Sequence, residues 1–317
     1  MPEKTGNPLT AKFLEYARDL ALATKSRAIL VYADVFKKAG SLEEFIRKCS
    51  EVDVVLATRD AELFEECKSK HSYVLSVPPI RLTRAGQIKM AVLLGFTEGV
   101  FTHGDKLVCL SGIADSGVLD LVMYTETQDE FEMFASSLSE QLTDGVRPEV
   151  FERLLNIAAN LANEGREGKP VGTTFVIGDV DMVFKHSEQM ILNPFSGHPR
   201  EKRNVLDPAL EETMKEFATI DGAFIISGDG YVETAGVFLR STVPGVELPL
   251  GLGARHQSAS AITAATAAVA ITVSESTGTV TVYHDGKILV EIEKPRPIGE
   301  AAPPARHPIP PTADQSP

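Results

Sequence analysis

One aspartate in the second half of the chain has the placement of a metal ligand. Asp221 and Gly222 stand at the start of a predicted strand, 221–227, which continues with the apolar residues Ala-Phe-Ile-Ile typical of a buried strand. A carboxylate at the mouth of such a strand lies at the edge of the sheet, and the glycine lets a ligand approach the backbone. Such a carboxylate is a natural ligand for a hard divalent cation. The alternative is an Asx turn that only starts the strand.

A second segment, Gly251 to Ala259, has the composition of an anion site. Its glycines precede Arg255, His256 and Ser258 at the predicted start of a helix. The first turn of a helix offers free N–H groups and a partial positive charge, and a guanidinium is a fixed fork of donors that matches phosphate oxygens. The plain alternative is a surface turn in which the arginine forms a salt bridge and the histidine is structural.

A third polar position, Glu275, ends a predicted strand beside a turn. Taken alone it is a solvated carboxylate. Together with Asp221 and Arg255 it completes a set of two carboxylates for a metal and one cation for phosphate. That set is the one required for nucleotidyl transfer, in which a metal and fixed cations stabilise charge at phosphorus.

Other common catalytic motifs do not occur in the sequence. There is no Walker A pattern, no complete dinucleotide fingerprint after the first strands and no GxSxG elbow, and the seven histidines have no metal-binding spacing. The three cysteines, Cys49, Cys67 and Cys109, are an odd number without metal spacing. They fit small buried side chains in a reducing cytosol.

The elements that must position these residues fall into two regions. Over 8–125, predicted helices alternate with short apolar strands, which is typical of a mostly parallel sheet with helices on both faces. One of these helices is predicted over 83–94 and ends at Gly95. Over 173–292, strands dominate and are joined by Gly-Asp-Gly and Asp-Gly turn signals, which indicates a mixed sheet covered by helices.

The domain organisation follows from these regions. We predict an N-terminal three-layer α/β sandwich over 1–144 and a mixed-sheet α/β domain over 145–293, with the turn-rich stretch 143–145 between predicted helices at 129–142 and 148–164. From residue 294 onwards eight of the 24 residues are proline. Residues 294–317 are therefore predicted to be a disordered or extended tail.

The charge balance narrows the range of partners. The chain has 317 residues, with 31 Lys and Arg against 44 Asp and Glu and a formal net charge of −13. An acidic chain without a basic run repels nucleic acid and anionic membranes, so we expect neither as a partner. The apolar-leaning stretch 259–273 is too short to span a bilayer, and the N-terminus lacks the apolar core of a signal peptide. We therefore expect a cytoplasmic protein.

Three motifs in order carry a resemblance to a known family. Asp221-Gly-Ala, Gly253-Ala-Arg-His and Ser274-Glu-Ser-Thr-Gly resemble the diadenylate cyclase domain found in the DNA-integrity scanning protein DisA and its relatives. This resemblance extends over about 148–293. The first half is similar to the C-terminal domain of pyruvate kinase, through Gly104-Asp-Lys-Leu-Val and its flanking strands. The combination resembles the soluble archaeal-type diadenylate cyclase.

The resemblance implies an enzyme that joins two ATP into cyclic di-AMP and releases two pyrophosphates, with Mn²⁺ or Mg²⁺ as cofactor. It assigns Asp221 to the metal and to activation of the ribose 3′-hydroxyl, and Glu275 to a second acidic position near the metal. It assigns Arg255 and His256 to the triphosphate. The remaining nucleotide contacts that it implies are Gly222, Ala223, Gly236, Val237, Phe238, Leu239, Gly253, Ala254, Gln257 and Ser258. Because each domain holds one ATP, two copies must face each other in a homo-oligomer.

Two segments depart from the family pattern. The usual Gly-Thr-Arg-His-Arg is here Gly-Ala-Arg-His-Gln, so Ala254 lacks a hydroxyl and Gln257 replaces a cation but keeps a hydrogen-bond donor. A frequent second glutamate is here Ser276. These changes motivate one alternative, a catalytically silent sensor that binds ATP or cyclic di-AMP. In a second alternative the N-terminal half is the ligand-binding module and the rest a scaffold; otherwise that half is expected to regulate the enzyme or to join protomers.

Overall fold

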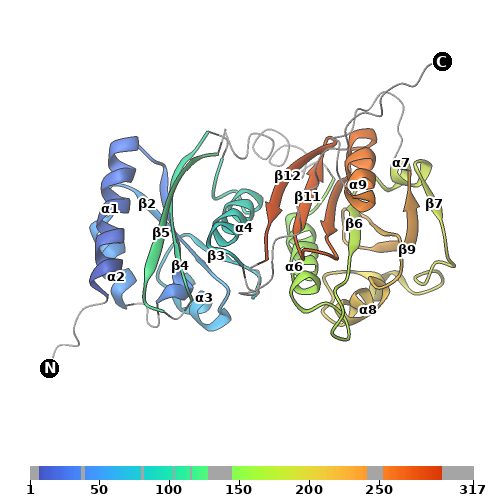
Figure 1. Cartoon of the computed structure of the whole chain (residues 1–317), viewed down its shortest axis with the longest axis horizontal. Coiled ribbons are helices and arrows are strands. Elements are labelled where there is room, and N and C mark those ends of the chain that lie inside the picture. The colour runs from blue at the N-terminus through green and yellow to red at the C-terminus, as the bar shows by residue number, and fades with distance from the viewer. Residues whose placement is uncertain are drawn as a thin grey trace, which may run out of the picture.

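The computed structural model contains two β-sheets, one in each half of the chain, and helices lie on both faces of each sheet (Figure 1). The residues that it describes are 7–36, 40–79, 82–102, 104–114, 116–127, 145–240 and 253–294. We refer to residues 7–127 as the N-terminal half and to residues 145–294 as the C-terminal half. The two-sheet α/β architecture predicted from the sequence is confirmed. The helix predicted over 129–142 lies outside the described residues, as does the tail beyond 294.

The N-terminal half is built around a five-stranded sheet with the order β3-β2-β1-β4-β5. Its strands are β1 (Ala28–Tyr32), β2 (Asp53–Thr58), β3 (Val74–Ser76), β4 (Lys106–Gly112) and β5 (Leu119–Glu126). Its helices are α1 (Pro8–Thr24), η1 (Ala33–Val35), α2 (Gly40–Lys48), α3 (Ala61–Lys68) and α4 (Arg84–Thr97). β1 to β4 are parallel, and β5 is antiparallel at one edge. The alternating helices are the crossover connections that parallel strands need.

Helices cover both faces of this sheet. One core contains buried side chains of α1, α2 and α3, among them Leu14, Leu42 and Cys67. The other face packs against α4, which supplies a run of buried side chains to a separate core. Among the described residues all three cysteines are buried and none forms a disulfide. No described helix combines the length and the apolar character that a membrane span requires.

One helix is longer than the sequence predicted. α4 continues through Gly95 to Thr97, although we expected the glycine to end it. The physical reason is packing, because the ring of Phe101 occupies the space that a side chain at position 95 would need. This glycine therefore permits a close contact inside a helix instead of terminating it.

The C-terminal half is built around a seven-stranded sheet with the order β12-β11-β10-β6-β8-β9-β7. Its strands are β6 (Thr173–Ile177), β7 (Ser187–Gln189), β8 (Ala223–Ile226), β9 (Val232–Leu239), β10 (Val269–Val273), β11 (Val280–His284) and β12 (Lys287–Ile292). Its helices are α6 (Pro148–Glu164), α7 (Val180–Lys185), η2 (Arg200–Arg203), α8 (Leu210–Phe217) and α9 (Ala254–Ala265). β6 and β8 are parallel neighbours, and the other pairs are antiparallel.

Both turn signals of this half form tight connections. Asp285 and Gly286 have φ angles of 48° and 74° and join β11 to β12, as a two-residue hairpin turn requires. In the β8–β9 connection the N–H of Gly230 donates to the carbonyl of Ser227 at 2.9 Å. The short elements α7 and β7 were not predicted.

The two halves share one hydrophobic core. α6 lies on one face of the seven-stranded sheet and α9 on the other, and α4 of the N-terminal half packs against β12 and α6 (Figure 1). Buried side chains from α4, α6 and the inner faces of both sheets form a single cluster. The N-terminal half is therefore in direct contact with the sheet that carries the candidate site.

Candidate active site

The three charged residues predicted from the sequence lie together in the structure. Nη2 of Arg255 is 3.5 Å from Oδ1 of Asp221, and its Nη1 is 3.4 Å from Oε2 of Glu275. The two carboxylates come from different connections, one just before β8 and the other just after β10, each separated from its strand by a single residue. The arginine lies in the first turn of α9. They meet because β6 and β8 begin at the same edge of the sheet at which the antiparallel β10 ends.

These side chains are open to a ligand. The exposed fraction of the side chain is 93% for Asp221, 60% for Glu275 and 37% for Arg255. Both ion pairs are also longer than the 2.7–2.9 Å typical of a charge-assisted hydrogen bond. The guanidinium is thus loosely shared between two carboxylates, and it can exchange them for another anion at little cost.

Gly172, which the sequence analysis missed, leaves the space that the guanidinium of Arg255 occupies. A Cβ atom on Gly172 would lie 2.7 Å from Nη1 of Arg255 and 3.0 Å from Cβ of Glu275. A side chain at this position would therefore displace the arginine. Its location directly before β6 is the only signal in the sequence, and many glycines that merely precede strands share it.

Two glycines of the predicted nucleotide site allow close backbone approach. Gly222 has a φ of 114°, and a Cβ there would lie 2.6 Å from the backbone N of Val237. Gly236 has a φ of 70°, and a Cβ there would lie 2.5 Å from Cγ1 of Ile191. Both positions are restricted to glycine by conformation and by space. They bring the start of β8 and the middle of β9 together beside Asp221.

The other predicted positions on β8 and β9 differ in what they expose. Ala223, Val237 and Leu239 are buried in the core beneath α9, so their side chains do not face an open site. Phe238 points outward, with 48% of the residue exposed. Of these four, only the phenylalanine presents a side chain on which a base could stack.

The first turn of α9 holds the remaining predicted residues. Gly253 is the N-cap and makes no side-chain capping bond, and its carbonyl accepts from the N–H of Gln257 at 3.0 Å. Ala254 begins the helix, and its carbonyl accepts from the hydroxyl of Ser258 at 2.9 Å. That hydroxyl proton is therefore engaged within the helix. The predicted contact of Ser258 with phosphate would need this bond to break.

The Nδ1 side of the His256 ring faces the sheet. Its Nδ1 is 2.6 Å from the hydroxyl oxygen of Tyr283 and 3.5 Å from Oγ1 of Thr272. Burial lowers the pKa of His256, and the nearby Arg255 lowers it further, against an opposing effect of Glu291. Burial also raises the pKa of Tyr283, so that it keeps its proton. The imidazole is thus neutral near pH 7, with Nδ1 engaged by the tyrosine hydroxyl.

The two carboxylates can hold part of a metal site. Among the described residues, no three His, Cys, Asp or Glu side chains lie close enough to form a complete one. Asp221 and Glu275 instead offer a pair of exposed oxygen donors on either side of one guanidinium. Such a pair fits Mg²⁺ or Mn²⁺, which commonly take one or two carboxylates and complete their shell with substrate phosphates and water.

Comparison with known proteins gives two family matches. The family described as "DisA bacterial checkpoint controller nucleotide-binding" matches residues 160–288. The family described as "Probable sensor domain DacZ_P" matches residues 9–134. The first match contains Asp221, Arg255 and Glu275, and the second covers most of the N-terminal half.

Individual proteins show similarity over much of the chain. A protein named diadenylate cyclase from Methanocaldococcus jannaschii is 30% identical over 305 residues, which cover 90% of this chain and 97% of that protein. A protein named diadenylate cyclase from Haloferax volcanii is 35% identical over 213 residues, which cover 65% of this chain and 75% of that protein. The solved structure of DacA from Staphylococcus aureus is 22% identical with a TM-score of 0.29, and the match covers 44% of this chain and 84% of that one.

Proposed function

Because this chain belongs to the diadenylate cyclase family, we propose that it condenses two ATP into cyclic di-AMP and releases two pyrophosphates. The observation that carries the proposal is the position of Arg255 between Asp221 and Glu275 at one exposed sheet edge. The test is incubation of the purified protein with ATP and Mn²⁺, followed by detection of cyclic di-AMP by mass spectrometry. ATP binding without product would instead support the silent sensor that Ala254 and Gln257 suggest.

The charged residues divide the chemistry between them. Asp221 and Glu275 would hold the divalent cation, which would supply charge neutralisation at the α-phosphate and a lower pKa of the attacking hydroxyl. Asp221 also accepts the proton of the ribose 3′-hydroxyl. Arg255 leaves the carboxylates and directs its fork of donors to the triphosphate. The long ion pairs of the free protein support this exchange of partners.

The neighbouring backbone and side chains orient the nucleotide. The close contacts of Gly222 with the backbone of β9 and of Gly236 with Ile191 fix the backbone beside Asp221, against which the ribose and base would lie. The exposed ring of Phe238 offers a stacking surface for adenine. His256 donates or accepts through Nε2 beside the phosphates, while Tyr283 holds the other side of the ring.

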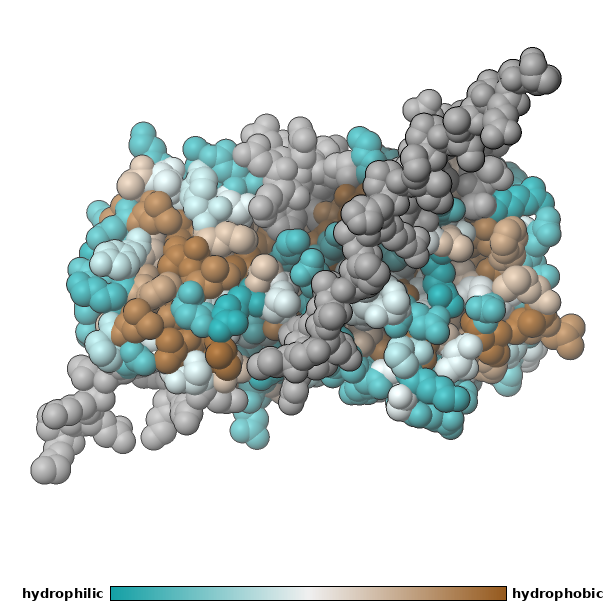
Figure 2. Space-filling view, viewed as in Figure 1, coloured by the Kyte–Doolittle hydropathy of each residue, from teal (hydrophilic) through white to brown (hydrophobic). Residues whose placement is uncertain are grey.

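Two such sites must meet, because the product contains two phosphodiester bonds between two nucleotides. Exposed apolar side chains of the C-terminal half support this pairing. The large ones among the described residues are Phe184, Met190, Ile191, Leu192, Ile220 and Phe238. Figure 2 shows apolar side chains gathered at the end of the molecule that holds β7 and β9. Apolar surface of this kind commonly marks a protein–protein contact, and we assign it to a second copy facing the first.

Arg255→Ala is expected to raise the KM for ATP and to lower turnover. The substitution removes charge-assisted bonds to phosphate worth roughly 1.5–3 kcal/mol, which corresponds to a loss of about ten- to a hundredfold in kcat/KM. Steady-state kinetics measure the loss. Arg255→Lys keeps the positive charge but lacks the forked donors, so its kcat/KM should lie between those of the wild type and the alanine variant. Wild-type kinetics in the alanine variant would show that Arg255 does not bind the triphosphate.

Tyr283→Phe is expected to keep the fold and to reduce kcat/KM about fivefold, because one hydrogen bond that orients His256 is lost. The side chain is fully buried, and phenylalanine fills nearly the same space. The pH titration of His256 by NMR supplies a second readout, since its ring loses the partner at Nδ1. An unchanged titration together with unchanged kinetics would show that the tyrosine does not orient the histidine.

A further inference from the structure

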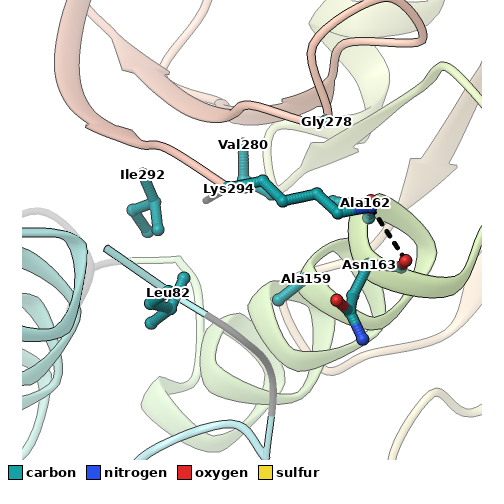
Figure 3. A pocket seen from close by; sticks show the side chains of 8 residues that line it. All are labelled: Leu82, Ala159, Ala162, Asn163, Gly278, Val280, Ile292 and Lys294. Carbon is teal, nitrogen blue, oxygen red and sulfur yellow. Dashed lines mark hydrogen bonds between the residues drawn. The ribbon is translucent and has the colours of Figure 1, made fainter. Parts of the chain in front are cut away.

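Lys294, which the sequence analysis placed in the tail, is anchored to the C-terminal half. Its Nζ donates to the carbonyl of Ala162 at 3.1 Å and to the carbonyl of Asn163 at 2.9 Å (Figure 3). Both carbonyls belong to the last turn of α6, where intrahelical donors run out. A cation at this end is also favoured by the helix dipole. The far end of the lysine side chain is therefore fixed.

The aliphatic part of the same side chain lies against a glycine. A Cβ on Gly278 would be 3.0 Å from Cδ of Lys294 and 3.1 Å from the carbonyl oxygen of Ala162. Figure 3 shows the lysine extended from the end of β12 toward Ala162, with Gly278 above it. The glycine has a φ of 66°, so its conformation as well as its surroundings excludes a side chain. The lysine thus closes over the backbone at this point.

Gly278 belongs to the turn that carries Glu275. The N–H of Gly278 donates to the carbonyl of Ser274 at 2.8 Å, and the N–H of Ser274 donates to the carbonyl of Thr279 at 2.9 Å. These two bonds close the turn 274–279, from which the carboxylate of Glu275 reaches Arg255. Contacts that fix the glycine end of the turn therefore also restrict the position of the glutamate.

The N-terminal half contacts the same stretch from the other side. Leu82 and Ile292 line the hollow into which Lys294 extends (Figure 3). A Cβ on Gly86, in the first turn of α4, would lie 3.4 Å from the carbonyl oxygen of Glu293. The end of β12 is thus held against α4 at the point from which the lysine projects.

We propose that Lys294 is a positioning residue for Glu275, and that it acts by clamping the turn 274–279 against the end of α6. The start of α4, in the N-terminal half, packs against the end of β12 and so supports the position of Lys294. The expected effect on activity rests on the proposed function, whereas the effect on the turn itself does not. Hydrogen exchange measures the effect on the turn, and the Mn²⁺ requirement of synthesis measures the effect on activity.

Lys294→Met keeps most of the aliphatic chain and removes the ammonium group. In the full-length protein, hydrogen exchange at the amides of Ser274 and Gly278 is expected to accelerate about tenfold, because the turn loses its anchor. The Mn²⁺ concentration for half-maximal cyclic di-AMP synthesis is expected to rise about tenfold, as is usual when support for a metal ligand is lost. Exchange in β6 should stay at the wild-type rate.

Two further variants make the result specific. Lys294→Arg retains a cation that can reach the helix carbonyls. Its exchange rates in the turn and its Mn²⁺ requirement should therefore stay close to the wild-type values. Lys287→Met, at the exposed start of the same strand, should change neither. Wild-type exchange in the turn together with a wild-type Mn²⁺ requirement in Lys294→Met would overturn the proposal. If the wild-type protein makes no cyclic di-AMP, the proposed function fails, and hydrogen exchange alone decides whether the clamp exists.

Discussion

Asp221→Asn is expected to lower the rate of cyclic di-AMP formation by about a hundred- to ten-thousandfold, the range typical of losing a group that transfers a proton. The amide has the same size as the carboxylate, but it is a poor ligand for a hard cation and cannot accept a proton. The side chain is almost fully exposed and has one long contact with Arg255, so the fold should not depend on it. Product is measured by mass spectrometry, and ATP affinity by calorimetry.

A matched control is available in the same hairpin. Asp229 is an exposed aspartate in the β8–β9 connection, and Asp229→Asn makes the identical chemical change away from Arg255. That variant should retain wild-type turnover. If Asp221→Asn also retained turnover, the carboxylate would have no role in metal binding or proton transfer. If it lost ATP binding as well as turnover, the carboxylate would act on the substrate rather than on the chemical step.

Local signals predicted much of the fold. α6 runs over 148–164 as predicted, because Pro148 suits the first helical position and Gly165 follows the last. The hairpin at Asp285 and Gly286 followed from residues that tolerate positive φ. The grouping of the charged residues in the candidate site could be predicted as well, because these residues stand where strands and a helix begin or end. The topology then brings those ends to one edge of the sheet.

The missed features depend on contacts between residues far apart in the chain. Gly172 precedes a strand like many loop glycines, and Gly95 resembles the glycine that ends a helix although it lies inside α4. Their roles appear only when Arg255 and Phe101 are seen to fill the space beside them. The partner of His256 is Tyr283, which is 27 residues away on β11. Lys294 was hidden by the proline-rich composition that follows it. In each case the decisive quantity is a tertiary distance, which residue type and local spacing do not encode.

A monomeric form of this protein is expected to make almost no cyclic di-AMP, with specific activity at least about a thousandfold below that of the paired form. In the proposed mechanism one site holds one ATP, so in a monomer the second nucleotide would have to arrive from solution instead of from a facing site, and the advantage of proximity would be lost. Leu192→Asp is designed to produce the monomer. The side chain is 95% exposed, so the change should cost a single copy little, whereas in the pair it would bury an uncompensated charge.

Sedimentation and kinetics on the same samples test this expectation. Leu192→Met keeps the surface apolar and should sediment and react as wild type does. Mixing wild type with a ninefold excess of Asp221→Asn protein supplies an independent test, because in random pairs only roughly one wild-type copy in ten meets another. Activity per wild-type copy should then fall to about one tenth, while the same excess of an unrelated protein should have no effect. A monomer verified by sedimentation that synthesised cyclic di-AMP at the undiminished rate would show that one copy can position both nucleotides, and the facing arrangement would have to be abandoned.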